Sequence, residues 1–159
     1  MALRAGDPLP SFEGKLSDGT VWKSSDRRGR SLVLYFYPKD FTSGCTKEAC
    51  QFRDAYPDLN VGLEADIIGV SRDPVETHAR FRAEHRLPFP LLADTDGSIA
   101  RLFGATHLWG LVPLTKRVTF VADPEGILQG VFHHELAVGR HVREVRECLE
   151  RIRDRGRRS

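Results

Sequence analysis

The sequence predicts an α/β fold in which helices flank a mixed central sheet. Short apolar runs that are typical of buried strands alternate with segments of helical pattern, and a hairpin pattern follows near the end of the chain. The 159 residues fit one domain over residues 1–159, with a basic tail from about residue 153 that we expect to fray.

The N-terminal residues predict a β-hairpin. Ser17-Asp18-Gly19 has the composition of a tight turn, and it separates two strand-like segments at residues 12–16 and 21–23. We therefore expect a hairpin over residues 10–24.

A continuous apolar run at residues 32–37 (LVLYFY) predicts a central strand that is buried on both faces. A loop should follow over residues 38–44, and a helix from about residue 45 to 55. Pro57 ends or kinks that helix, because proline lacks a backbone N–H and clashes with the preceding turn.

A second strand and a second helix come next. Residues 66–70 (DIIGV) form another buried apolar run. Asp73 is expected to cap the following helix, with Pro74 at the first helical position and Glu76 as the capping-box partner. This helix should end near residue 86.

The alternation continues to the C-terminus. Residues 89–93 predict a short strand and residues 98–103 a short helix, and the strands at 118–121 and 127–132 should pair about the turn at 123–126. A last helix carries apolar residues at steps of four, three, four and three, which places them on one face. They are Val138, Val142, Val145, Leu149 and Ile152.

Composition argues against several classes of protein. The net charge of +2, from 24 basic and 22 acidic residues, gives no reason to expect nucleic acid as a partner. No apolar run approaches the roughly 18–20 residues that span a membrane, and the N-terminus lacks a signal-peptide pattern. Three cysteines are too few for a disulfide framework, so we expect a cytoplasmic protein whose cysteines begin as thiols.

Cys45 follows the first buried strand and opens the next helix, a place where α/β folds build active sites. The unpaired N–H groups of a helix N-terminus stabilise the thiolate, which is the reactive form. Gly44 permits close backbone approach, the Thr42 hydroxyl can reach the sulfur, and Pro38 stiffens the end of the strand. A small buried cysteine explains the position equally well, so position alone leaves both interpretations open.

The segment YFYPKDFTSGCTKEACQFRD, residues 35–54, resembles the active-site segment of peroxiredoxins. It is most similar to the bacterioferritin-comigratory-protein or peroxiredoxin Q group. The family pattern of Pro, three residues, Thr, two residues and Cys falls on Pro38, Thr42 and Cys45.

This resemblance continues through residues 69–94 and 116–126 and covers the chain to about residue 152. It implies a thioredoxin-like fold and a thiol-dependent peroxidase that uses no metal and no organic cofactor. Hydrogen peroxide and organic hydroperoxides would be the substrates, and thioredoxin or a similar dithiol protein the reductant. Ser43 departs from the family pattern, which often has proline there, but no catalytic group is lost.

The resemblance also implies a role for each motif residue. Cys45 would be the peroxidatic thiolate, which attacks a peroxide and leaves as a sulfenic acid. Thr42 would bond the thiolate and orient the peroxide, Pro38 would shield the site, and Gly44 would contribute to substrate binding. The family's active-site arginine maps onto Arg117, whose guanidinium can stabilise the thiolate and the peroxide oxygens. From sequence alone, Arg117 could equally be an ordinary charge at a sheet edge.

Cys50 is implied by the resemblance to be the resolving cysteine of an intramolecular disulfide, which makes a monomer the simplest expectation. A buried helix position and a zinc site with His133 and His134 are alternatives, although the spacing does not match usual zinc sites. In a helix the Cα atoms of Cys45 and Cys50 lie about 8–9 Å apart, whereas a disulfide fails beyond about 7 Å. The helix must therefore unwind locally in each cycle.

Other side chains near the motif have secondary roles in this interpretation. Glu48 and Arg53 are expected to form a charge network that holds the loop, Phe41 and Trp109 to line the approach to Cys45, and Cys148 to be structural. The alternative function is a non-catalytic thioredoxin-like binding module or holdase chaperone, for which Cys45 would be unreactive.

Overall fold

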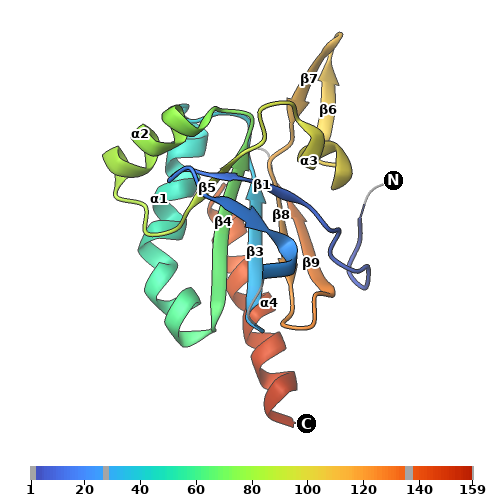
Figure 1. Cartoon of the computed structure of the whole chain (residues 1–159). Coiled ribbons are helices and arrows are strands. Elements are labelled where there is room, and N and C mark those ends of the chain that lie inside the picture. The colour runs from blue at the N-terminus through green and yellow to red at the C-terminus, as the bar shows by residue number, and fades with distance from the viewer. Residues whose placement is uncertain (1–2, 27–28, 135–137, 159) are drawn as a thin grey trace.

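A seven-stranded mixed sheet forms the centre of the computed structural model, which describes residues 3–26, 29–134 and 138–158 (Figure 1). Its strand order is β2-β1-β5-β4-β3-β8-β9. The strands are β1 (Glu13–Leu16), β2 (Val21–Lys23), β3 (Ser31–Phe36), β4 (Ala65–Ser71), β5 (Leu91–Ala93), β8 (Val118–Ala122) and β9 (Leu128–His133).

The helices pack against this sheet, and a small hairpin projects from it. The helices are α1 (Ser43–Pro57), α2 (Val75–His85), α3 (Ser98–Leu102) and α4 (Val138–Arg158), with a 3₁₀ turn at Ser24–Asp26 and a π turn at Asp58–Gly62. The hairpin is a separate two-stranded sheet of β6 (Thr106–Trp109) and β7 (Val112–Thr115). The predicted α/β fold with a mixed sheet and an N-terminal hairpin is confirmed.

The strand β3 lies inside the sheet, with β4 parallel on one side and β8 antiparallel on the other. All six of its residues are buried, as expected for an apolar run that is covered on both faces. Because Phe36 pairs with Val118, the end of β3 lies beside the start of β8. The loop that follows β3 therefore meets the residue that precedes β8.

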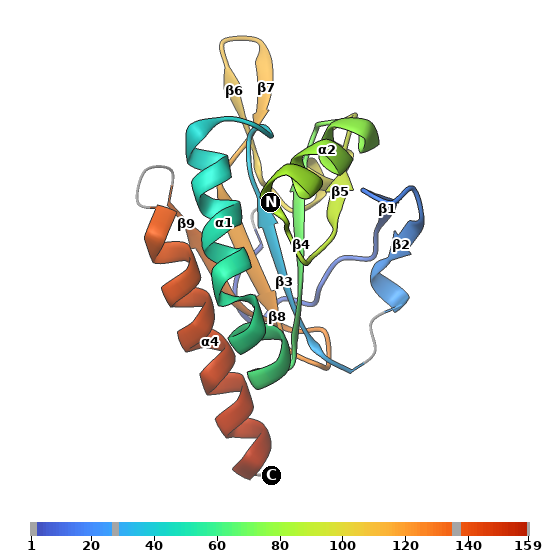
Figure 2. The same cartoon turned by 90° about the vertical axis from the view of Figure 1, so that its left-hand side faces the viewer.

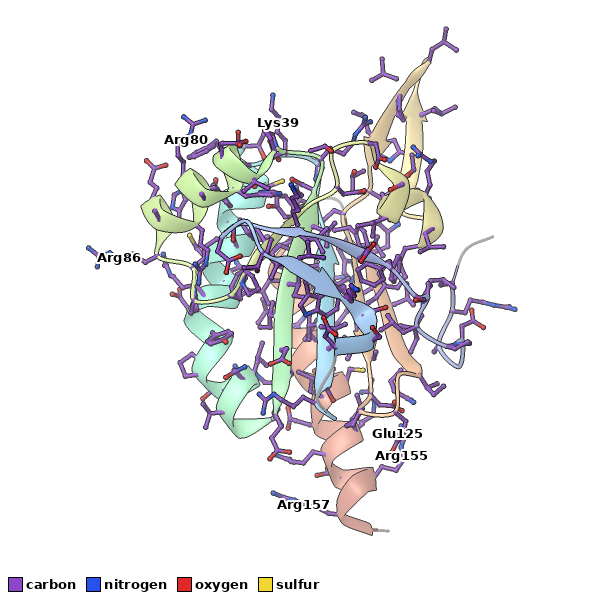
Figure 3. All side chains as sticks on the ribbon, viewed as in Figure 1. Lys39, Arg80, Arg86, Glu125, Arg155 and Arg157 are labelled. Atoms are coloured by element: carbon purple, nitrogen blue, oxygen red, sulfur yellow. The ribbon has the colours of Figure 1, made fainter. Side chains whose placement is uncertain are left out.

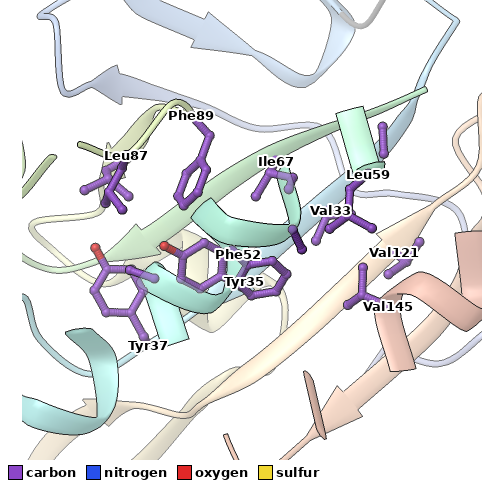
Figure 4. Packing of buried hydrophobic residues seen from close by; sticks show 14 of the residues in the cluster. Val33, Tyr35, Tyr37, Phe52, Leu59, Ile67, Leu87, Phe89, Val121 and Val145 are labelled. Atoms are coloured by element: carbon purple, nitrogen blue, oxygen red, sulfur yellow. The ribbon is translucent and has the colours of Figure 1, made fainter. Parts of the chain in front are cut away.

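Two apolar clusters cover the two faces of the sheet. On one face, α1 and α4 lie side by side (Figure 2) and pack on β3 and β4. Aromatic rings fill this cluster, and Tyr35 stacks on Phe52 with ring centroids 4.7 Å apart (Figure 4). On the other face, α3 and the N-terminal segment cover the outer side of the same strands.

Two elements differ from the sequence prediction. The β6–β7 hairpin was not predicted, and its signal is weak because Pro113 lies within β7. Proline cannot donate to a strand ladder, but an edge strand tolerates it. The helix α1 was expected from about residue 45 to 55, but it starts at Ser43 and passes through Pro57 into the π turn.

The predicted cap of α2 is also wrong. Its N-cap is Pro74 in extended conformation, and no side chain caps this helix end. The Asp73 carboxylate instead accepts hydrogen bonds from the Ser71 hydroxyl and from the backbone N–H of Asp40. Asp73 therefore anchors the loop before α1, a contact across 33 residues that the local pattern does not contain.

Charged side chains reach outward at both ends of the molecule, with Lys39 and Arg80 at one end and Arg157 at the other (Figure 3). The basic tail from about residue 153, which was expected to fray, is instead helical, because α4 continues through it to Arg158. Among the described helices, none combines the length and the apolar character that a membrane span requires.

Gly69→Ala should destabilise the fold. A Cβ at Gly69 would lie 2.7 Å from the ring of Tyr35 and 2.8 Å from Leu91, both in the packed core. We expect the free energy of unfolding in urea to fall by about 1–3 kcal/mol. The control is Gly62→Ala, where a Cβ meets nothing within 4 Å and a change within about 0.5 kcal/mol is expected. Equal stability of the two variants would show that the core yields to the added methyl group.

Candidate active site

Cys45 lies in the first turn of α1, directly after the loop that leaves β3. Thr42 is the N-cap residue, with φ −84° and ψ 152°, and its carbonyl accepts the Thr46 N–H at 2.9 Å. The side chain of Cys45 is 1% exposed and belongs to the cluster that α1 forms with the sheet. The helix N-terminus therefore acts on a sulfur that water barely reaches, where a partial positive charge is little screened.

Arg117 is the charged partner of this sulfur. It directly precedes β8 and is 6% exposed. Its Nη2 donates to Cys45 Sγ at 3.3 Å, and its Nη1 donates to Glu48 Oε1 at 2.8 Å. Burial lowers the pKa of Arg117, but the charges of Glu48 and Cys45 outweigh that effect and raise it. The guanidinium thus stays charged and keeps one orientation toward the sulfur.

Gly44 leaves room for the Arg117 guanidinium beside Cys45. A Cβ at that position would lie 3.2 Å from Arg117 Nη2, closer than most real Cβ contacts. A larger residue would push the guanidinium away from Cys45.

Thr42 and Pro38 belong to the segment that leads from β3 into α1. The Thr42 hydroxyl donates to the Lys39 carbonyl at 2.8 Å, so its proton is directed away from Cys45 and its lone pairs are available as acceptors. Thr42 is exposed, and Pro38 is half-buried at the end of β3. Phe41, with φ 65°, is 46% exposed and packs edge-on against Phe81. The side chain of Trp109 lies outside the described part of the structure.

The predicted network of Glu48 and Arg53 is wrong. Glu48 faces the sheet, fully buried beside Arg117, while Arg53 pairs with Asp54 and donates to the His85 carbonyl on α2. Positions five apart on a helix point in directions that differ by about 140°. The two charges therefore serve different contacts.

A buried network that the sequence did not predict holds the loop before Cys45. The Tyr37 hydroxyl donates to Asp40 Oδ1 at 2.5 Å, and Asp40 Oδ2 lies 2.6 Å from His78 Nδ1. His78 Nε2 lies 3.1 Å from the Leu92 carbonyl, to which it must donate because a carbonyl only accepts. Asp40 is 2% exposed and His78 is fully buried.

Asp40, Asp73 and His78 are side chains of the kind that also bind metal ions. Their facing atoms are already hydrogen-bonded within the protein, to one another or to Tyr37 and Ser71. These hydrogen bonds attach the loop between β3 and α1 to α2 and β5. The sequence signal was weak, since a carboxylate and a histidine 38 residues apart have no local pattern.

The other two cysteines have different surroundings. Cys50 is half-buried on α1, five residues after Cys45, and the helix between them is continuous. Its Sγ lies 4.0 Å from His85 Nδ1. Cys148 is buried on α4, where burial raises the pKa of its thiol, and its Sγ would lie 3.1 Å from a Cβ at Gly130. Cys148 therefore packs in the core as a neutral thiol.

His141 on α4 lies beside Glu48 and is fully buried. Its Nδ1 lies 3.0 Å from the Thr119 hydroxyl and 3.7 Å from Glu48 Oε2, and its Nε2 lies 3.0 Å from the His134 carbonyl. Burial lowers the pKa of His141. Arg117 already compensates the Glu48 charge, and a neutral imidazole that accepts from the Thr119 hydroxyl and donates to the His134 carbonyl satisfies both of its hydrogen bonds.

Known proteins match this chain in sequence and in fold. The family model described as the AhpC/TSA family matches residues 5–131. Peroxiredoxin Bcp of Bacillus subtilis is 40% identical over 154 residues, which cover 94% of this chain and 97% of that protein. Chloroplastic peroxiredoxin Q of Populus jackii is 36% identical over 151 residues, which cover 94% of this chain and 70% of that protein.

Solved structures agree in fold. Peroxidoxin BcpB of Mycobacterium tuberculosis superposes with a TM-score of 0.87 at 35% identity, covering 94% of this chain and 98% of that one. The bacterioferritin comigratory protein of Xanthomonas campestris, studied for alkyl peroxide reduction, gives a TM-score of 0.84 at 34% identity, covering 92% of this chain and 97% of that one. The observed fold is therefore that of thioredoxin-like peroxiredoxins.

The buried neutral His141 should make the protein less stable in mild acid. The unfolded chain binds a proton at His141 as the pH falls through about 6.5, while the lowered pKa keeps the folded residue neutral. Stability therefore decreases as the pH falls through that window. Urea unfolding at pH 7.5 and 5.5 measures this loss, and in His141→Gln it should be smaller by about 1 kcal/mol. Equal losses in both proteins would contradict the neutral state of His141.

Proposed function

The chain belongs to the AhpC/TSA family and is a thiol-dependent peroxidase of the peroxiredoxin kind, and we propose that Cys45 is its peroxidatic residue. One observation carries this assignment. The Cys45 sulfur lies buried in the first turn of α1 and receives a hydrogen bond from Arg117 at 3.3 Å. A fixed guanidinium and a helix N-terminus both stabilise the thiolate, which is the attacking form.

The first step oxidises Cys45. The thiolate attacks one oxygen of a peroxide ROOH, the O–O bond breaks, and Cys45 becomes a sulfenic acid while RO⁻ takes a proton and leaves as ROH. Arg117 is suited to stabilise charge on the peroxide oxygens, because Glu48 accepts from its Nη1 and the guanidinium is held with Nη2 directed at the Cys45 sulfur. The Thr42 hydroxyl oxygen can accept a hydrogen bond from the peroxide O–H, since its own proton is donated to the Lys39 carbonyl.

The second step forms a disulfide between Cys45 and Cys50. The sulfenic acid and the Cys50 thiol condense with loss of water. An intact helix keeps their Cα atoms about 8–9 Å apart, so the first turns of α1 must open before the sulfurs can join. A dithiol protein such as thioredoxin would then reduce the disulfide by exchange.

Several finer features of the function follow as proposals. Phe41 is exposed in the loop between β3 and α1, where it offers an apolar contact to the organic part of a hydroperoxide. We therefore expect organic hydroperoxides as substrates in addition to hydrogen peroxide. A disulfide within one chain needs no second subunit, which supports a monomer. Dependence on a dithiol reductant supports a reducing compartment such as the cytoplasm.

One equivalent of hydrogen peroxide on the reduced protein tests the two-cysteine cycle by intact mass and non-reducing peptide mapping. The wild type should lose two hydrogens and show a Cys45–Cys50 cross-link. Cys50→Ser should gain one oxygen on Cys45, and Cys45→Ser should keep its mass. Cys148→Ser is the matched control and should behave like the wild type. An unchanged wild-type mass would favour the binding-module or holdase function instead.

Hydrogen exchange tests the opening of α1. In the reduced protein the amides of residues 46–56 should be protected by the continuous helix. The disulfide form should lose much of this protection, because the bond is incompatible with helical spacing. Equal protection in the two redox states would contradict the proposed unwinding.

A further inference from the structure

His85 lies against the second cysteine. It is the last residue of α2, and its Nδ1 lies 4.0 Å from Cys50 Sγ on α1. Its side chain is about one-quarter exposed, so protons can exchange with water. The imidazole thus lies between the half-buried Cys50 thiol and solvent, where it can pass a proton from one to the other.

Three contacts hold His85 in this position. Its ring packs edge-on against the ring of Phe81, with centroids 5.0 Å apart. The centroid of the Phe41 ring, in the loop between β3 and α1, lies 6.5 Å away. Its backbone carbonyl accepts Arg53 Nη1 at 2.9 Å. Because Arg53 and Cys50 are on the same helix, this bond keeps the end of α2 in register with the Cys50 turn.

We propose that His85 is the general base of the resolving step, a role that rests on the proposed Cys45–Cys50 cycle. Disulfide formation needs Cys50 as a thiolate. The unprotonated imidazole would accept the Cys50 proton through Nδ1 and become imidazolium. The thiolate then attacks the Cys45 sulfenic sulfur, the S–O bond breaks, and hydroxide leaves. The imidazolium proton and the hydroxide yield water, so the net reaction is sulfenic acid plus thiol to disulfide plus water.

The charges around the pair suit such a transfer. Glu84 Oε2 lies 3.9 Å from His85 Nε2, and the C-terminal end of α2 also favours an imidazolium. On the α1 side, Asp54 raises the pKa of Arg53 most, and the charge of Cys50 contributes to the same shift, so Arg53 and Cys50 interact. Tyr35 of β3 also faces this region, and burial raises its pKa so that it keeps its proton. The positive and negative charges formed by the transfer therefore each have a favourable neighbour.

The position also sets the order of events. The contact exists while α1 is helical, and opening of the helix carries Cys50 toward Cys45 and away from α2. Proton transfer therefore precedes unwinding, and Cys50 departs as the nucleophile rather than as a neutral thiol.

Rapid mixing of the full-length reduced protein with one equivalent of hydrogen peroxide tests this role. After acid quench, mass spectrometry separates the rate of Cys45 oxidation from the rate of disulfide formation. His85→Asn keeps a hydrogen-bonding group near the Nδ1 position but cannot accept a proton at neutral pH, and His85→Ala removes the ring. The matched control is His107→Asn on β6.

At pH 7 both His85 variants should oxidise Cys45 within about twofold of the wild-type rate and form the disulfide at least about tenfold more slowly. The deficit should disappear near pH ~9.5, where an ordinary thiol ionises without help, and imidazole should partly restore His85→Ala. The control should match the wild type in both rates.

If both His85 variants oxidise Cys45 normally and form the disulfide at the wild-type rate, the role of His85 is overturned and the proposed Cys45–Cys50 cycle stands. A deficit of the same size at neutral and at alkaline pH would also overturn it, because lost packing rather than lost proton transfer would then explain the defect. Failure of wild-type Cys45 to oxidise would instead contradict the proposed function itself.

Discussion

The buried ion pair between Arg117 and Glu48 is the interaction on which the site depends. Each charge costs several kcal/mol to remove from water, and loss of one partner leaves the other unpaired at a cost of about 3–5 kcal/mol. The pair therefore holds the start of β8 and the first turns of α1 together. Glu48 accepts from Nη1 of the guanidinium, and Nη2 donates to Cys45.

The loop between β3 and α1 is fixed from its other side by a second buried network. Asp40 bonds Tyr37 and His78, and Asp73 receives the Asp40 N–H. These contacts keep the loop in place independently of the Arg117 pair. The loop can thus keep its geometry while the helix that follows it opens, which a cycle through Cys50 requires.

Much of the fold follows from local pattern. The strands β3 and β4 contain continuous apolar runs, and these runs predicted their burial on both faces. The sequence order around Cys45 also predicted its place at a helix start. The hairpin β6–β7 escaped prediction because Pro113 weakens the strand pattern, and the cap of α2 was misassigned because Asp73 bonds a distant loop.

The sequence by itself determined the α/β class, the strand–loop–helix placement of Cys45 and the family to which the chain belongs, because these depend on residues that are neighbours in the chain. Only the tertiary structure decided which charges meet. Glu48 pairs with Arg117 rather than Arg53, Asp40 pairs with His78, and Cys50 contacts His85. Those pairs lie 35 to 69 residues apart. They form only because the sheet order and the packing of α1 against α2 and β8 bring them together, and no local propensity encodes that choice.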